Sequence, residues 1–320
     1  MNSDWIECLR WCHRADAPES VDALINCLVD HCRRSSYSQP ILSRSKKSGM
    51  IRAEGYTILY PGALASIGNL SVEASDDDEL SQQLLVDVVR ELFVAAFEHG
   101  AELVQAISPL IASRFSNDME PGFISPDPLR DEVLKTSGMF PIAKLVQMEA
   151  IGLPSIPKLT ENPLSLESGP LAFVAHYDVP AVRWHQLIES TYIETRDVPE
   201  LNGLRRMEHT LEGYAANIVG VPDTWWLVQC KGLDIGCLLL TRTANNCCEL
   251  TYFGLTPQWR GKGLSKAIMN YVRNWAIANQ INGITLAVDL RNLPAIRLYQ
   301  SCGFTTQSFV QAWIRFRRAP

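Results

Sequence analysis

A glycine-rich turn between a predicted strand and a predicted helix constrains this chain more than any other feature. Residues 250–255 (LTYFGL) are apolar and aromatic, which predicts a strand, and Pro257 ends it because proline cannot donate a hydrogen bond to a neighbouring strand. The sequence RGKG follows at 260–263, and residues 264–278 then carry apolar side chains at helical spacing. The first amides of a helix have no partner inside it, and glycines let the backbone come close to an anion. The arrangement is typical of a phosphate-binding turn in an α/β protein.

A second pattern lies just downstream. Residues 284–290 (ITLAVDL) predict another strand, and a set of residues at defined spacing follows it: Asn292, Ala295, Tyr299, Gly303 and Phe304. The two patterns resemble the motifs V-x-P-x-x-[QR]-x-x-G-x-[GA] and N-x-x-A-x-x-x-Y-x-x-x-G-F of the GNAT superfamily, the acetyl-CoA-dependent N-acetyltransferases. In the first motif Ser265 replaces the usual Gly or Ala, and we expect it to be tolerated because serine is small. The resemblance covers roughly the last third of the chain closely.

The resemblance implies where acetyl-CoA would bind as co-substrate. The backbone of Phe253, Gly254 and Leu255 would hydrogen-bond the pantetheine arm and polarise the thioester carbonyl. The other residues implied in cofactor binding are Arg260, Gly261, Lys262, Gly263, Leu264, Ser265 and Asn292. Asn292 also fits an ordinary helix N-cap.

Acetyl transfer to an amine requires a base, because an amine with a pKa near ~10.4 is protonated at neutral pH. The departing thiolate, whose thiol has a pKa of roughly 8.5, leaves more easily when it is protonated. By resemblance, Glu249 is the general base, often acting through water, and Tyr299 protonates the thiolate. The residues alone also fit an exposed glutamate at a strand end and a core tyrosine.

Other residues near the two motifs have weaker claims on function. Asp289 points away from the core if the alternate residues of its strand face the core, which makes it a secondary candidate for holding the substrate amine. Two interpretations fit Trp225, Trp226 and His185: they lie near the acceptor pocket, or they pack against other side chains. Packing is the simpler interpretation. Cys247 and Cys248 need no covalent role, because transfer in this family is normally direct.

Composition limits the class of protein. The chain has 320 residues, of which 47% are hydrophobic and 20% charged, as expected for a globular protein with two domains. A net charge of −6 argues against general affinity for nucleic acid or anionic membranes. We expect neither a membrane span nor a signal peptide, because charged residues interrupt the apolar runs and the N-terminal segment. Nine cysteines fit reduced thiols in a cytoplasm.

The N-terminal part carries several potential metal ligands. Residues 4–34 predict two amphipathic helices that contain Cys8, Cys12, His13, Cys27, His31 and Cys32. These types are the usual ligands of zinc, but their spacing is not that of paired C-x-x-C knuckles. Cysteines at i, i+4 on amphipathic helices are more often small buried hydrophobes, so the sequence favours packing and we expect no metal.

The next segments predict further strands and helices. Residues 33–48 are polar and basic and predict a solvated loop, and residues 50–72 predict three short strands with turns near Gly55, Gly62 and Gly68. Residues 75–79 (SDDDE) predict an acidic N-cap and first turn of a helix that ends near His99. A strand at 103–107, a helix at 128–136 and a final strand at 141–149 complete this half.

The order of these elements repeats in the second half, which suggests two related domains. We expect a degenerate GNAT-like domain at 1–151, a proline-rich linker at 152–170 and a catalytic GNAT domain at 171–320 with its last strand at 309–316. The fold class is α/β (α+β), with tandem GNAT folds that each have a mixed central sheet flanked by helices. Such a tandem arrangement resembles mycothiol synthase. In the first half acids replace the phosphate turn, and Leu134 corresponds to Tyr299.

The sequence therefore predicts a cytoplasmic N-acetyltransferase that moves an acetyl group directly from acetyl-CoA to an amine of a small molecule. Two alternatives remain open. One is transfer to a protein N-terminus, or transfer of another acyl group. The other is a non-catalytic acyl-CoA-binding sensor or scaffold. The acceptor and the oligomeric state do not follow from the sequence.

Overall fold

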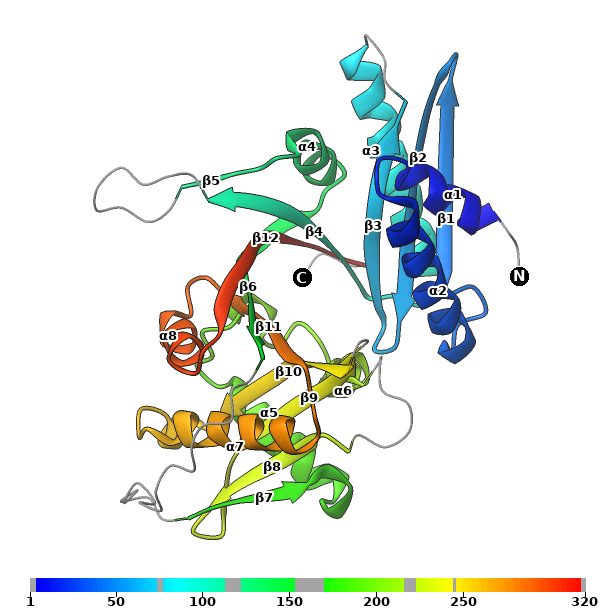
Figure 1. The fold of residues 1–320 in the computed structure, drawn as a ribbon. Helices are drawn as coiled ribbons and strands as arrows, with labels where there is room; N and C mark the ends of the chain where they lie inside the picture. Colours follow the sequence, from blue (N-terminus) through cyan, green and yellow to red (C-terminus); the bar gives the residue numbers. More distant parts are fainter. Residues whose placement is uncertain are drawn as a thin grey trace. The chain divides into compact units, whose positions relative to one another are not determined.

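The structure is a computed structural model and describes residues 4–73, 77–112, 122–152, 170–215, 223–243 and 246–317 (Figure 1). The chain forms two compact units. The first comprises Met1–Ala143, His209–Ala216 and Phe309–Pro320, and the second comprises Lys144–Glu208 and Asn217–Ser308. Neither unit is a continuous stretch of chain, so the units do not follow the boundaries expected at 151 and 171.

The first unit has one mixed sheet. Its strands are β1 (Ile41–Ser48), β2 (Ile51–Tyr60), β3 (Leu64–Val72), β4 (Leu103–Ala112) and β12 (Thr305–Phe316), with β5 (Phe123–Ile124) beside β4. β1, β2 and β3 pair antiparallel, β3 and β4 pair parallel, and β4 pairs antiparallel with β12. The helices are α1 (Asp4–Cys12), α2 (Pro18–Arg34), α3 (Asp78–Glu98) and α4 (Pro128–Thr136), joined by part of α6 (Met207–Tyr214).

Two hydrophobic clusters hold the first unit together. The larger is built around α3, whose Leu84, Val88 and Leu92 are buried, and it includes Trp313 of β12. The smaller lies between α1 and α2 and the first two strands. The Asp77 side chain caps α3 by accepting from the Leu80 amide, as predicted for this acidic helix start; residues 75 and 76 lie outside the described residues.

Two predictions for the first unit were wrong. The polar segment expected to be a loop contains β1, because an edge strand can carry serine and lysine on its solvent side. Gly55 and Gly68 lie inside strands rather than in turns, with a register shift between Gly55 and Thr57. The turn near Gly62 is confirmed, with φ of +80° at that glycine.

The second unit repeats the same pairings. β8 (Trp225–Cys230), β9 (Leu233–Thr243) and β10 (Cys247–Leu255) pair antiparallel, β10 and β11 (Gly283–Asp289) pair parallel, and β11 pairs antiparallel with β6 (Phe140–Ile151). β7 (Leu171–Ala175) adds an antiparallel edge strand beside β8. The repetition confirms the predicted fold class.

The helices of the second unit cover both faces of its sheet. They are α5 (Ala181–Tyr192), α7 (Leu264–Ala278) and α8 (Leu293–Ser301), with 3₁₀ turns η1 (His176–Asp178), η2 (Pro199–Leu201) and η4 (Pro257–Trp259). Adjacent residues of a strand point to opposite faces. Trp225 accordingly stacks on Trp184 of α5, while Trp226 contacts Tyr271 and Trp275 of α7.

The last strand of each half lies in the other unit. Residues 141–149 were expected to finish the first domain, but Leu145–Ile151 of β6 pair with β11. Residues 309–316 were expected to finish the second, but they pair with Leu103–Leu110 of β4. Alternation of apolar residues shows which face of a strand is buried, and it does not identify the neighbouring strand. Residues 153–169, within the expected linker, lie outside the described residues.

The thiols and helices complete the description. All nine cysteines are free. Cys8 and Cys12 are buried as predicted, whereas Cys27 is exposed.

The two histidines of this part of the chain have partners within the protein. His31 bonds the Leu59 carbonyl through Nε2 at 2.8 Å, and His13 contacts Asp16 and Tyr56. None of the helices in the described ranges is long and apolar enough to cross a bilayer.

Candidate active site

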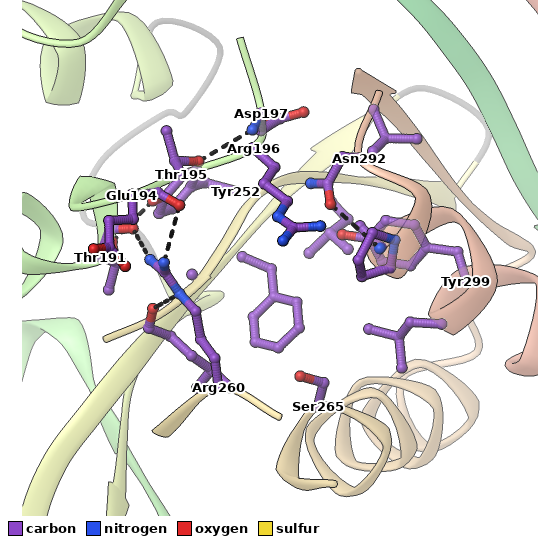
Figure 2. A pocket seen from close by; sticks show the side chains of 18 of the residues that line it. Thr191, Glu194, Thr195, Arg196, Asp197, Tyr252, Arg260, Ser265, Asn292 and Tyr299 are labelled. Atoms are coloured by element: carbon purple, nitrogen blue, oxygen red, sulfur yellow. Dashed lines mark hydrogen bonds between the residues drawn. The ribbon is translucent and has the colours of Figure 1, made fainter. Parts of the chain in front are cut away.

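A cavity opens where two parallel strands diverge. β10 and β11 pair only at Cys248 with Ile284 and at Glu249 with Thr285. Beyond that point β10 follows β9, with a register shift between Leu250 and Tyr252, while β11 follows β6. The cavity has a volume of about 600 Å³ and is the size of a small-ligand site. Its wall combines β10 and β11 with α8, the start of α7 and the segment after α5 (Figure 2).

The predicted glycine-rich turn closes one end of this cavity. Gly261 and Gly263 have φ of +72° and +74°, a region that other residues adopt only at a cost, and both line the cavity. Gly263 is the N-cap of α7 and provides no side-chain cap. The first amides of α7 are therefore left for another acceptor, and the Ser265 side chain lies beside them in the wall.

Arg260 lines the cavity and also has a structural role. Its guanidinium donates to three backbone carbonyls: Leu255 at 2.9 Å, Thr191 at 2.9 Å and Glu194 at 3.1 Å (Figure 2). Arg260 thus ties the end of β10 to the segment after α5. These bonds use three of its five N–H donors, and Arg260 also lines the cavity, so it shapes the wall and its role in phosphate binding stays a prediction.

Lys262 also lies apart from the cavity wall. Its ammonium group is 4.9 Å from the centre of the Trp259 ring, and its side chain is exposed. It is not among the residues that line the cavity. A contact with a bound anion would require it to leave this ring.

The β10 residues line the cavity as predicted, with one difference. Phe253, Gly254 and Leu255 all contribute to the wall. A Cβ at Gly254, however, would lie 2.8 Å from the Thr191 side chain and from the Tyr252 hydroxyl. Packing against Thr191 of α5 therefore requires glycine at position 254, whether or not a ligand also approaches it.

The second motif places two predicted residues in the wall. The Asn292 side chain caps α8 by accepting from the Ala295 amide at 3.4 Å, so the N-cap interpretation is confirmed, and the residue also lines the cavity. Tyr299 is buried in the opposite part of α8 and also lines the cavity. Burial, together with the charge of Asp197, raises the pKa of the Tyr299 phenol.

Glu249 lies where the strands still pair, one residue before the cavity wall begins at Leu250. It does not line the cavity. Burial raises the pKa of its carboxyl group. A role as general base would therefore need a water molecule as relay.

The sequence analysis missed Asp197, a carboxylate in the cavity wall. The residue as a whole is exposed to solvent. The atoms packed around its carboxyl group nevertheless desolvate that group and raise its pKa. Its Oδ1 accepts from the Asp289 amide at 2.9 Å. It follows α5 in a segment with no hydrophobic periodicity, and neither of the two motifs includes it.

Asp289 holds that segment and does not reach the cavity. It is fully buried, and its carboxylate accepts from the Val198 amide at 3.1 Å and from the Arg291 guanidinium. Arg291 in turn pairs with Glu200. Asp289 is therefore a positioning residue, and the prediction that it holds the substrate amine was wrong.

The remaining predicted residues lie outside the wall. Trp225 and Trp226 are buried in the two aromatic clusters described above, which confirms packing. His185, Cys247 and Cys248 do not line the cavity either.

In the first unit a side chain bridges β3 and β4, the strands that correspond to β10 and β11. β3 and β4 also pair parallel over a short stretch. The Arg130 guanidinium donates to the Gly68 carbonyl of β3 at 3.0 Å and to the Ile107 carbonyl of β4 at 3.2 Å. Arg130 lies three residues after the N-cap Asp127, as Ala295 lies three residues after Asn292.

Comparison with known proteins identifies relatives of the second unit. Residues 185–304 match the acetyltransferase (GNAT) family. A stretch of 71 residues is 32% identical to streptothricin acetyltransferase from Escherichia coli, and it covers 22% of this chain and 41% of that enzyme. The chain thus spans about two fifths of the length of this curated relative.

Two solved structures share the fold over most of the chain. A GCN5-related N-acetyltransferase from Sphaerobacter thermophilus is 15% identical over 83% of this chain and 77% of its own, with a TM-score of 0.51. A conserved protein of unknown function from Staphylococcus epidermidis is 10% identical over 86% of this chain and 94% of its own, with a TM-score of 0.50. At these identities the likeness concerns the fold alone. The resemblance to mycothiol synthase stays a prediction.

Proposed function

We propose that the chain transfers an acetyl group from acetyl-CoA directly to an amine of a small molecule, because residues 185–304 match the GNAT acetyltransferase family. The observation that supports this most is the cavity between β10 and β11. It has uncapped helix amides at one end and Tyr299 and Asp197 in its wall. The name of the E. coli relative supports a small-molecule acceptor.

The cofactor would lie along the diverging edge of β10. Its pantetheine amides would pair with the backbone of Phe253 to Leu255, because β11 leaves that edge without a partner strand. Its pyrophosphate would accept from the first amides of α7, directly after the two positive-φ glycines. Here the backbone supplies the binding, since Arg260 is engaged and Lys262 lies over a tryptophan ring.

The acceptor amine would approach from the side of Asp197. An ammonium group is attracted to the Asp197 and Glu194 carboxylates of the wall, and it must lose a proton before its nitrogen attacks the thioester carbonyl. We propose that Glu249 accepts that proton through a water molecule. Asp197 is the competing base, because it lines the cavity directly.

The leaving group would take its proton from Tyr299. The raised pKa of the phenol keeps the hydroxyl protonated at neutral pH, which is the state that an acid requires. When the tetrahedral intermediate collapses, the carbon–sulfur bond breaks and the thiolate takes the phenolic proton. The nitrogen loses its remaining extra proton to water, and the phenolate of Tyr299 regains a proton from water. The amide product and free coenzyme A result.

The test is release of free thiol from acetyl-CoA by the intact protein with a panel of acceptors. The panel should contain small-molecule amines, including streptothricin, and peptides with free N-termini. We expect thiol release with at least one small-molecule amine, together with an acetylated product of the matching mass. Turnover only with peptides would move the acceptor to protein N-termini, and acetyl-CoA binding without turnover for any acceptor would favour a sensor.

A further inference from the structure

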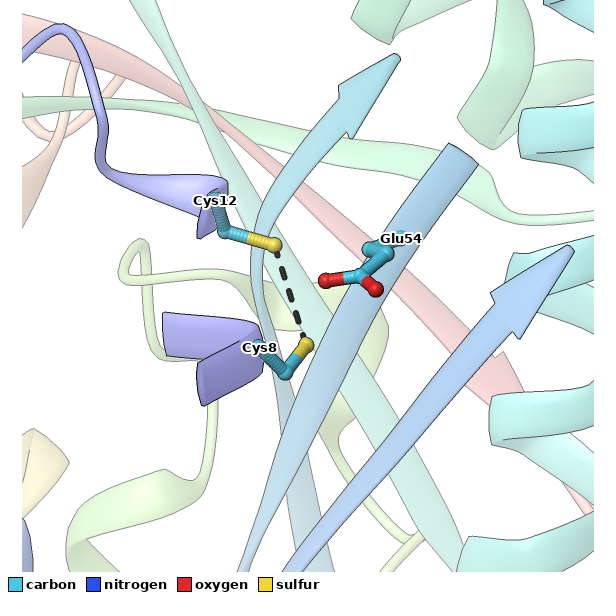
Figure 3. Close-up of side chains that lie close together, drawn as sticks. All are labelled: Cys8, Cys12 and Glu54. Atoms are coloured by element: carbon cyan, nitrogen blue, oxygen red, sulfur yellow. Dashed lines mark hydrogen bonds between the residues drawn. The ribbon is translucent and has the colours of Figure 1, made fainter. Parts of the chain in front are cut away.

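Two thiols and a carboxylate meet in the core of the first unit, and none of these residues lines the cavity. Cys8 and Cys12 lie one turn apart on α1, and Glu54 lies on β2 (Figure 3). All three residues are buried, with 5%, 8% and 2% of their surfaces exposed. One ligand atom from each lies within 4.8 Å of the other two. Figure 3 shows the carboxylate directed toward the two sulfur atoms.

Packing accounts for the cysteines but not for the glutamate. One carboxylate oxygen of Glu54, Oε1, pairs with Arg52. The other, Oε2, is buried without a hydrogen-bond partner in the described structure, and the side chain is 3% exposed. A buried polar atom without a partner costs roughly 1–3 kcal/mol, and more when the group is charged. A core that needed only to be filled would place an apolar residue here.

The distance between the sulfurs fits a bound metal ion. The two Sγ atoms are 3.9 Å apart. In a tetrahedral zinc site with Zn–S bonds of about 2.3 Å, two sulfur ligands are about 3.8 Å apart. A disulfide would require the sulfurs to move to about 2.05 Å, and it would leave Glu54 Oε2 as it is. Oxidation of the pair therefore explains less than metal binding.

We propose that Cys8, Cys12 and Glu54 bind one Zn²⁺ ion that fastens α1 to β2. Thiolates are soft ligands that favour zinc over magnesium or calcium, and a carboxylate is a common third ligand. The fourth position falls to a water molecule or to the Gly55 carbonyl, which lies 3.5 Å from Cys8 Sγ. Binding releases the two thiol protons. Two thiolates, one carboxylate, Zn²⁺ and the neighbouring Arg52 then sum to zero charge.

The proposal is independent of acetyl transfer, because no residue of the cluster lines the β10–β11 cavity. Its test uses the full chain, reduced and stripped of metal, titrated with Co²⁺ as an optical substitute for Zn²⁺. We expect a thiolate-to-cobalt charge-transfer band that saturates at one equivalent and is displaced by Zn²⁺. The Cys8→Ser and Cys12→Ser variants should lose the band, and Glu54→Gln should weaken Zn²⁺ binding at least about 10-fold.

Cys27→Ser and Cys32→Ser are the matched controls, because these cysteines lie on the neighbouring helix α2 outside the cluster. Both should keep the band. A wild-type measurement guards against variants that fail to fold: Zn²⁺ should protect Cys8 and Cys12 from alkylation, as read by mass spectrometry, and leave Cys27 reactive. No band in the wild type, no protection, or a band lost only in the Cys27 or Cys32 variants would each overturn the proposal.

Discussion

Tyr299 allows the chemistry to be tested at a single hydroxyl group. Tyr299→Phe preserves the ring and its contact with Phe304, so acetyl-CoA affinity should stay within about twofold. Turnover should fall by about 10²–10⁴, the usual contribution of a general acid. Single-turnover kinetics and calorimetric titration separate these quantities. Unchanged turnover, with chemistry rate-limiting, would exclude Tyr299 from the proton transfer.

Asp197 and Glu249 can be compared through matched isosteric variants. If Glu249 is the base, Glu249→Gln should lower turnover most at low pH, where the free amine is scarcest, and a higher pH should partly restore it. Asp197→Asn should then raise the KM of the acceptor with less effect on the pH profile. The reverse pattern would assign the base to Asp197. The measurement is kcat and kcat/KM against pH for both variants.

Asp197→Asn should not weaken the fold. The pKa of Asp197 is raised in the folded protein, so ionisation of this side chain opposes folding above the ordinary aspartate pKa of about 3.9. The stability of the wild type relative to Asp197→Asn should therefore fall as the pH rises through that value. Asn also keeps the oxygen that accepts from the Asp289 amide. Denaturant unfolding at pH 3 and pH 7 checks both points.

The motif residues were predictable because their constraints are local. Positive φ at Gly261 and Gly263 and the cap at Asn292 depend on a few neighbours along the chain. The contacts of Arg260 and Asp289 were not predictable, because these partners lie about 60–90 residues away, at the end of α5 and in the segment after it. Asp197 was missed for the same reason.

At the scale of the element, the glycine-rich turn can be tested against a matched turn. Gly263→Val puts a branched side chain at φ of +74°, where the pyrophosphate would approach. Gly232→Val puts the same side chain at a φ of +75° in the β8–β9 turn, outside the cavity wall. At neither glycine would another atom lie within 4 Å of the new Cβ. Both variants should lose similar stability. Only Gly263→Val should lose acetyl-CoA affinity, at least about 10-fold or ~1.4 kcal/mol.

Normal acetyl-CoA titration of a folded Gly263→Val protein would place the cofactor elsewhere. An equal loss of affinity in both variants would mean that the effect arises from the fold rather than from the turn.

The exchanged strands make the two halves dependent on each other. A chain cut between residues 152 and 170 separates β4 from β12 and β11 from β6. The first fragment loses Trp313 from its core, and removal of a core tryptophan side chain costs about 3–5 kcal/mol of a total of roughly 5–15. We expect neither fragment alone to unfold cooperatively, and the mixture to recover acetyl-CoA binding. An isolated 170–320 fragment that binds acetyl-CoA with a cooperative transition would contradict this.

The bounds of helices and strands could be predicted from the sequence more closely than the pairing partners of the strands. The helix at 264–278 has the predicted bounds, because its apolar spacing and the glycine before it are local signals. The partners of β6 and β12 could not be derived, since both strands carry a pattern that suits either sheet.

For the whole molecule, one acetyl-CoA should bind per chain. Within the described ranges, only the second unit combines diverging strands with a glycine-rich helix start, whereas in the first unit Arg130 bridges β3 and β4 and Asp77 caps the helix. A carboxylate at the helix start repels phosphate by about 1 kcal/mol at ~4 Å even in water. Calorimetry of the intact protein measures the stoichiometry. A second equivalent that survives Gly263→Val would reveal an active site in the first unit.

The position of β12 also sets the order in which the molecule can be completed during translation. A ribosome synthesises residues 103–110 well before their partner strand, residues 309–316, because about 200 residues of chain separate the two strands. The first sheet therefore emerges with an open edge at β4, and such an edge can pair with other nascent chains. Completion of the first sheet must await synthesis of residues 309–316, so anything that slows elongation between the two strands would prolong the time in which chaperones have to shield that edge.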